Sequence, residues 1–199
     1  VRCLDADASA AMREAIKAAG REHDTLGGIF EVWAFGVMPG LGSHVSGDRR
    51  LDGRIAQAFM GIQAIKAVEI GAGFELGRMR GSRAHDEIYH EPGRGYFRRT
   101  NRSGGLEGGM THGAPVVVRA AMKPISTLSR PLDSVDVATK QPRKAHKERS
   151  DICASPAAAV VGEAALAFVL AQALVEKFGG DSMTELQSAV RRYSEGLGA

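Results

Sequence analysis

Three short polar segments carry the residue types that bind anions and move protons. The first, Lys123-Pro124-Ile125-Ser126-Thr127, directly follows a β-branched run, so an ammonium group and two hydroxyls stand where a strand ends. Such a group can hold a phosphate or a ring carbonyl. The alternative, which the pattern alone favours, is a turn in which the hydroxyls bond local backbone groups.

The second segment is Arg149-Ser150-Asp151, just before a long apolar run. Arg149 could bind an anion while Asp151 takes part in proton transfer. Asp151 could equally serve only as a cap, because the N–H groups at the start of a helix favour a nearby carboxylate. The residues by themselves leave both interpretations open.

The third segment contains Gln63 and Ala64, beside the apolar stripe of a predicted helix. Gln63 could reach the polar edge of a ligand. The pattern alone favours the simpler interpretation, an exposed glutamine on a helix surface.

The stretch 101–113 contains five glycines and leads into the β-branched run Val116–Val118. Glycine allows backbone conformations and close approaches that other residues do not, and a linker would be richer in Ser, Pro or charge. We therefore expect a ligand-facing loop. His112 lies in this loop, but the six histidines and two cysteines show no metal-ligand spacing, so no metal site is expected.

Composition places few limits on function. The 199 residues carry a formal charge of +3 and a pI near 9.0, which fits a phosphate-bearing ligand without requiring one. Basic runs flanked by aromatic residues are lacking, which argues against a nucleic-acid partner. Cys3 and Cys153 are far apart, so the reducing cytoplasm is the expected compartment. The apolar stretch 154–175 contains Glu163 and Gln172, and we expect a buried helix there, not a membrane span.

Hydrophobic periodicity predicts a mixture of helices and strands. Mixed order without a βαβ alternation indicates a single α+β domain over residues 1–199. The predicted elements are a helix over 6–22, a strand over 28–37 covered on both faces except near Glu31, a helix from Asp48 or Asp52 with the stripe Leu51, Ile55, Phe59, Ile62 and Ile65, a short strand over 68–74, an exposed loop over 77–100, a strand over 116–122, a hairpin over 131–147, a centrally buried helix over 156–178, a helix from Asp181 or Ser182 to 193, and a frayed tail over 194–199.

Taken in order, these stretches resemble chorismate synthase over about residues 24–187, which corresponds to the C-terminal half of that family. Many motifs in the right order are far more specific than one glycine loop. The matching segments are Asp24-Thr-Leu-Gly-Gly, Gly40-Leu-Gly-Ser, Met60-Gly-Ile-Gln-Ala-Ile-Lys, Val68-Glu-Ile-Gly, Gly81-Ser-Arg-Ala-His-Asp-Glu, Thr100-Asn-Arg, Gly104-Gly-Leu-Glu-Gly-Gly-Met-Thr, Val118-Arg-Ala-Ala-Met-Lys-Pro-Ile-Ser-Thr, Arg149-Ser-Asp and Glu176-Lys-Phe-Gly-Gly-Asp-Ser.

The resemblance implies a sandwich with central helices between antiparallel β-sheets, assembled as a cytoplasmic homotetramer. It implies that 5-enolpyruvylshikimate 3-phosphate loses phosphate and a proton to give chorismate, with reduced FMN as cofactor and NADPH as a possible reductant. Neither a membrane nor a nucleic-acid partner is implied.

The resemblance also assigns residues. Asp151 corresponds to a carboxylate thought to relay a proton, and the flavin contacts correspond to Gln63, Ala64, Gly108, Lys123, Pro124, Ile125, Ser126, Thr127 and Arg149. Ser103 and His112 depart from the usual Ala and Asn of the family.

The family's two proposed general-acid histidines belong to its other half. We therefore expect the 199-residue chain by itself to be inactive, and the alternative function is a folding or oligomerisation module.

Overall fold

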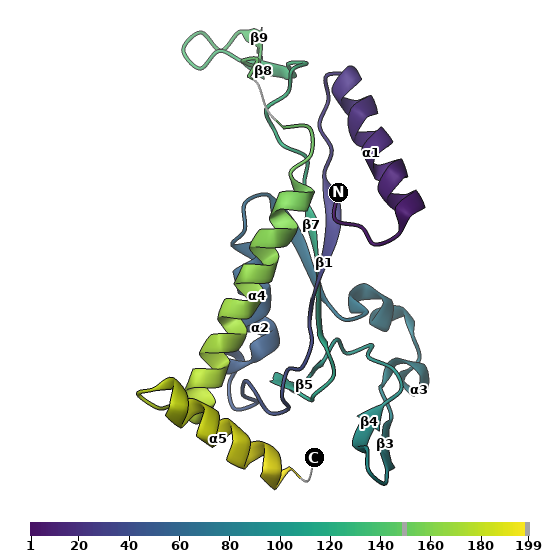
Figure 1. The fold of residues 1–199 in the computed structure, drawn as a ribbon. Coiled ribbons are helices and arrows are strands. Elements are labelled where there is room, and N and C mark those ends of the chain that lie inside the picture. The colour runs from purple at the N-terminus through teal and green to yellow at the C-terminus, as the bar shows by residue number, and fades with distance from the viewer. Residues whose placement is uncertain (149–150, 198–199) are drawn as a thin grey trace.

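The structure, a computed structural model, describes residues 1–148 and 151–197. Its centre is an antiparallel sheet in the order β1-β7-β2, built from β1 (Gly28–Ala34), β7 (Val116–Met122) and β2 (Ile65–Ile70). The helices α2 (Leu51–Met60) and α4 (Ser155–Phe178) pack side by side over one face of this sheet (Figure 1). The prediction of an α+β fold is confirmed.

The core lies between the sheet and these two helices. Alternation along β1 turns Phe30 and Val32 inward, and β7 supplies Val116 and Val118 from the same layer. The helical stripe of α2 meets them, with Leu51, Ile55 and Phe59 fully buried. The predicted stripe is therefore correct over these three residues.

Gly162 allows α4 to approach the sheet closely. A Cβ atom at this position would lie 2.9 Å from the Phe30 ring, 3.2 Å from Val32 and 3.3 Å from Phe59. These separations are shorter than ordinary carbon–carbon contacts, so the absence of a side chain sets the distance between helix and sheet.

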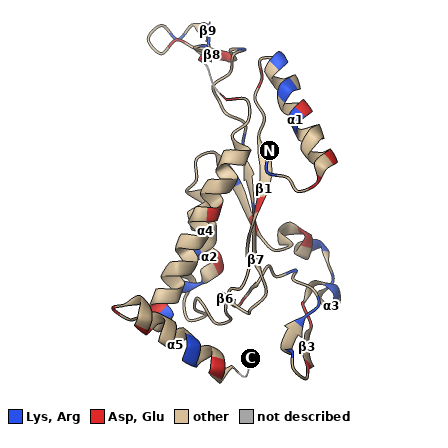
Figure 2. Cartoon of the chain, viewed as in Figure 1, with Lys and Arg blue, Asp and Glu red and all other residues tan. Residues whose placement is uncertain are grey.

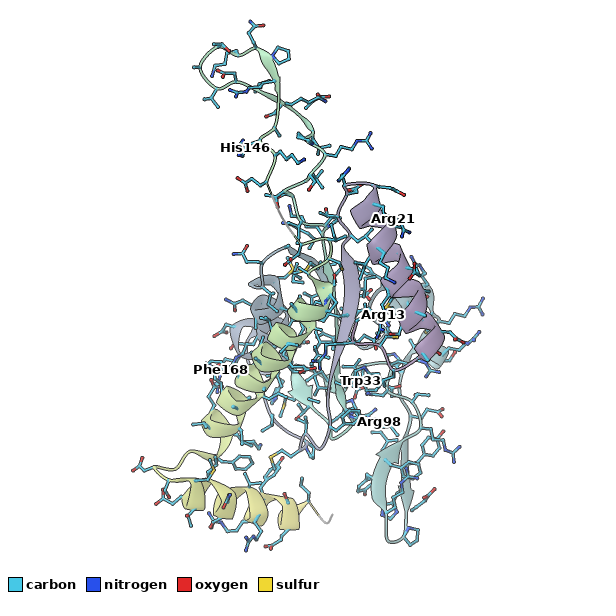
Figure 3. The ribbon with its side chains drawn as sticks, turned by 45° about the horizontal axis from the view of Figure 1, so that its top comes forward. Arg13, Arg21, Trp33, Arg98, His146 and Phe168 are labelled. Carbon is cyan, nitrogen blue, oxygen red and sulfur yellow. The ribbon has the colours of Figure 1, made fainter. Side chains whose placement is uncertain are left out.

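The prediction that β1 is covered on both faces is wrong for the face that points away from the helices. Ile29 is 68% exposed and Trp33 is 50% exposed, on the sheet face away from the helices. Likewise α4 is not enclosed all round, since Phe168 is 66% exposed on the side opposite Leu166 (Figure 3). Apolar periodicity shows that a face is suited to burial, but it does not show what covers the face.

By length and composition, α4 is also the one helix in the described chain that could cross a membrane. One face of it packs on β1 and α2, as the core helix of a globular domain does.

Two boundaries around α2 and β2 differ from the prediction. The helix ends at Met60, so Ile65 belongs to β2 and not to the helical stripe. The strand ends at Ile70, and Phe74 lies exposed in the 3₁₀ helix η2 (Gly73–Arg78) and not in a strand. The positive φ of Gly71 bends the chain out of the sheet.

The segment 77–100, predicted as an exposed loop, contains regular structure. It includes the short helix α3 (Gly81–Ala84) and the hairpin β3 (Ile88–Glu91) with β4 (Gly95–Arg98). Most of its side chains are exposed, as predicted, but Asp86 is buried.

The first and last helices agree with the prediction. Asp5 caps α1 (Ala6–Arg21), and Ser182 caps α5 (Met183–Gly196), which extends three residues into the predicted tail. The predicted hairpin over 131–147 is present. The other elements are η1 (Gly47–Arg49), β5 (Leu106–Glu107), β6 (Met110–Thr111), β8 (Asp133–Val135) and β9 (Pro142–Lys144).

Candidate functional site

Two of the three polar segments meet at the end of the central sheet. The Lys123 backbone N–H donates a 2.9 Å hydrogen bond to the carbonyl oxygen of Ala64. This contact extends the β2–β7 pairing by one step, because Ile65 already faces Met122. Gln63, Ala64 and Lys123 therefore lie together, although 59 positions separate Ala64 from Lys123 in the chain.

The backbone at Ala64 has an unusual conformation, with φ +66° in a residue that is not glycine. Such a conformation is costly for a residue with a Cβ, and it persists where the surrounding structure enforces it. Here the hydrogen bond to Lys123 and the start of β2 fix it. Gln63 is exposed and lines a cavity of about 700 Å³ between α2 and α4.

The segment 25–28 packs against Lys123–Ile125. The Thr25 hydroxyl donates a 2.8 Å hydrogen bond to the carbonyl of Ile125, 100 residues away. A Cβ atom at Gly27 would lie 2.4 Å from the carbonyl oxygen of Met122, so only glycine allows this approach. These contacts hold the loop that begins at Lys123 beside the start of β1.

The other side of the same segment contacts the chain that follows Asp151. The Leu26 N–H donates a 2.7 Å hydrogen bond to the carbonyl of Ile152, and Leu26 forms a parallel bridge with Cys153. Asp151 itself is exposed. The short segment 25–28 therefore lies between two of the polar segments and joins both to the end of the sheet.

The donors gathered here suit a polar, anionic ligand. Lys123 and Ser126 are exposed, and no residue within the described ranges pairs with the Lys123 ammonium group. Exposed side-chain amide, ammonium and hydroxyl groups of this kind bind phosphate and ring carbonyl oxygens. Arg149 lies outside the described residues.

The structure does not bring Gly108 to this group. Gly108 lies in the β5–β6 turn, whose neighbour Gly109 accepts a hydrogen bond from the first residue of α2, Leu51, whereas Gln63 follows the last turn of α2. The β5–β6 turn also lies near the start of β7 (Figure 1), whereas Lys123 directly follows the last residue of β7. Seven strand residues span about 20 Å, so Gly108 and Lys123 stand at opposite ends of the sheet.

Asp86 is a buried acidic residue whose role the sequence pattern alone does not predict. Its side chain is fully buried and accepts hydrogen bonds from the Thr100 hydroxyl at 2.5 Å and from the N–H groups of Arg102 and Ser103 at 2.9 Å. Burial by itself raises the pKa of this carboxyl group, but the hydrogen bonds from Ser103, Thr100 and Arg102 outweigh burial and lower it from 3.8 to about 2. The sequence signal that could have identified Asp86 is its position in the Gly81–Glu87 segment, which matches a motif of the family.

His112 contacts Ser103, another position that departs from the family pattern. Ser103 Oγ and His112 Nε2 lie 2.9 Å apart, and the buried Nδ1 atom has no partner among the described residues. Burial, followed by the charge of Arg98, lowers the pKa of His112. A neutral imidazole is therefore favoured at this position.

Comparisons with known proteins agree on one family. The family model described as chorismate synthase matches residues 1–175. The chorismate synthase of Desulforudis audaxviator is 59% identical over 199 residues, covering all of this chain and 51% of the relative. That of Streptomyces coelicolor is 60% identical over 197 residues, covering 99% of this chain and 50% of the relative.

A solved structure described as the crystal structure of chorismate synthase matches with a TM-score of 0.79 and 49% sequence identity. The match covers 94% of this chain and 48% of that chain. The chain thus spans about half the length of the relatives that it matches. Sequence motifs, fold and these comparisons together show that the chain belongs to the chorismate synthase family.

Proposed function

We propose that this chain forms the C-terminal part of a chorismate synthase and contributes one part of a reduced-FMN site. The reaction is the elimination of phosphate and a proton from 5-enolpyruvylshikimate 3-phosphate, which gives chorismate. The observation that carries the proposal is the hydrogen bond between Lys123 and Ala64, since it joins two segments that the family resemblance assigns to the flavin.

The residues present fit such a cofactor. Reduced FMN carries a phosphate and, when bound, supplies electron density that assists loss of the leaving group. Lys123 and Arg149 would favour its negative charge, and the hydroxyls of Ser126 and Thr127 would bind its polar edge. Arg149 would also stabilise the negative charge of the leaving phosphate.

Asp151 is proposed to relay a proton. It is exposed and directly precedes Ile152, whose carbonyl accepts a hydrogen bond from Leu26 near the end of the sheet where Lys123 lies, and this position in the chain supports the proposal. An ionised carboxylate in such a position can take a proton and pass it on. Gly108 is proposed as a further flavin contact on the family resemblance alone, because it stands at the other end of the sheet from Lys123.

The full assembly is proposed to be a cytoplasmic homotetramer in which NADPH serves as a possible reductant. The chain by itself is proposed to be inactive, because the resemblance assigns the family's two general-acid histidines to the other half of the family. Assay of chorismate formation with reduced FMN tests this, and turnover by the 199-residue chain would contradict it.

A binding experiment separates this proposal from the alternative of a folding or oligomerisation module. FMN fluorescence is measured during titration with the chain and with Lys123→Ala, Arg149→Ala and Lys17→Ala. Lys17 is an exposed lysine on α1 and serves as the matched control. Saturable quenching that is lost in the first two variants and kept in the third supports the flavin site. Absence of quenching by the unmodified chain favours the module.

A further inference from the structure

A second cavity lies between α3 and the β3–β4 hairpin, with a volume of about 320 Å³. None of the residues assigned to the flavin lines it. The lining side chains come from both sides of Asp86 in the sequence and from the segment that follows β4. They are Ser82, Arg83, His85, Glu87, Tyr89, Arg99, Thr100 and Arg102.

The charge of this cavity is predominantly positive. Three arginines line it, against one acidic residue, Glu87, whose carboxylate accepts a hydrogen bond from the Tyr89 hydroxyl. Arg102 lies 4.0 Å from the Asp86 carboxylate, whereas Arg83 and Arg99 have no carboxylate partner among the described residues. Figure 2 shows basic residues gathered on α3 and the neighbouring chain.

The walls of the cavity are held in place by buried contacts. Asp86 lies between the lining residues His85 and Glu87, and its hydrogen bonds to Thr100 and Arg102 tie one wall to the other. At the base of the hairpin, Arg98 donates a 2.5 Å hydrogen bond to the backbone carbonyl of Asp86. The cavity is therefore formed before any ligand arrives, which lowers the entropic cost of binding.

The arginine side chains are also oriented. The Arg99 guanidinium lies 4.1 Å from the centre of the Tyr89 ring, and that ring in turn stacks on Phe97 with centroids 5.7 Å apart. The Arg102 guanidinium donates a 3.1 Å hydrogen bond to the Thr100 hydroxyl. Stacking and hydrogen bonding reduce the freedom that these long side chains lose when they bind a ligand.

We propose that this cavity binds a phosphate group, either as free phosphate or as the head of a small phosphate monoester. Planar guanidinium groups match the paired oxygens of phosphate, and the Ser82 hydroxyl adds a neutral donor. The volume exceeds that of a bare phosphate ion, so the cavity also has room for the small organic part of a monoester.

Calorimetric titration of the 199-residue chain with inorganic phosphate, and separately with glycerol 2-phosphate, tests the proposal at constant ionic strength. The variants are Arg83→Gln and Arg99→Gln, with Arg94→Gln as the matched control. Arg94 belongs to the same hairpin and stacks on Phe97, but it does not line the cavity. Lys123→Ala reports on binding at the flavin residues, and circular dichroism checks that each variant is folded.

We expect saturable binding that Arg83→Gln and Arg99→Gln each weaken about tenfold, and that Arg94→Gln leaves unchanged. Tighter binding of glycerol 2-phosphate identifies a monoester as the ligand, and tighter binding of inorganic phosphate identifies the free ion. The proposal is overturned if neither compound saturates, if Arg94→Gln weakens binding as much as Arg83→Gln, or if only Lys123→Ala matters. Because the Arg83 side chain has no described partner, its replacement tests binding even where Arg99→Gln perturbs the hairpin.

Discussion

At the scale of single residues, Asp86 is the buried charge on which the local structure depends. Three hydrogen bonds to its carboxylate join the segment after α3 to residues 100–103, and through them to the glycine loop. A buried carboxylate that accepts several hydrogen bonds stays ionised and resists removal, because its partners would be left unsatisfied.

We predict that Asp86→Asn lowers the free energy of unfolding by about 2–3 kcal/mol, because an amide cannot accept all of these hydrogen bonds. Urea denaturation monitored by circular dichroism measures the change. Asp136→Asn is the control, since Asp136 also accepts two backbone hydrogen bonds but lies in the more exposed β8–β9 turn. Equal losses in the two variants would contradict the role of burial.

The same group makes stability depend on pH in a defined window. The folded pKa of Asp86, about 2, lies below its ordinary value of 3.8. Its contribution is therefore complete above about pH 4 and is lost as the pH falls toward about 2. The unmodified chain is expected to lose about 2 kcal/mol more than Asp86→Asn across this window, as measured by urea denaturation at each pH.

At the scale of elements, most helices and strands follow from periodicity and capping residues. The apolar stripe of α2 and the Ser182 cap of α5 are local signals, and the structure confirms them. Elements that depend on the pairing of two strands were predicted less well than helices. The hairpin β3–β4 was not predicted, because its two four-residue strands are short and carry polar or charged residues without a sustained apolar alternation.

Packing of α4 on the sheet depends on Gly162, a position that composition alone does not single out. We predict that Gly162→Val destabilises the fold by about 1–3 kcal/mol, because its side chain would overlap Phe30, Val32 and Phe59. Thermal and urea denaturation measure the effect. Ala167→Val, on the exposed face of the same helix, controls for the helix propensity of valine and is expected to change stability by less than half as much.

At the scale of the whole molecule, the chain leaves two apolar faces uncovered. One is the sheet face with Ile29 and Trp33, and the other is the outer face of α4 with Val161 and Phe168. Exposed patches of this kind mark surfaces that another structure covers. The chain spans half the length of its relatives, which fits a structure whose helices are central in the complete fold.

We predict that the 199-residue chain binds a hydrophobic dye such as anilinonaphthalene sulfonate and that Phe168→Ser reduces the dye fluorescence. Phe168 is 66% exposed, so its replacement should leave the urea midpoint nearly unchanged. Leu166→Ala, on the buried face of the same helix, should instead lower stability by about 2–5 kcal/mol. Dye binding that is insensitive to Phe168→Ser would show that this face is already covered, for example by self-association.

The sequence by itself determined the family, the order of the elements and the polar segments that carry chemistry. These features are local, since periodicity, caps and motifs depend on neighbours a few positions apart. It also identified the glycine loop, but it did not indicate where that loop stands relative to the other segments.

Only the tertiary structure decided which of these segments meet. It places Ala64 beside Lys123 and links Leu26 to Ile152, while Gly108 lies at the other end of the sheet. It also buries Asp86 and thereby forms the basic cavity beside it. The physical reason is that strand register and helix docking are fixed by contacts summed over the whole chain, and a local pattern records only that a side chain is suited to burial.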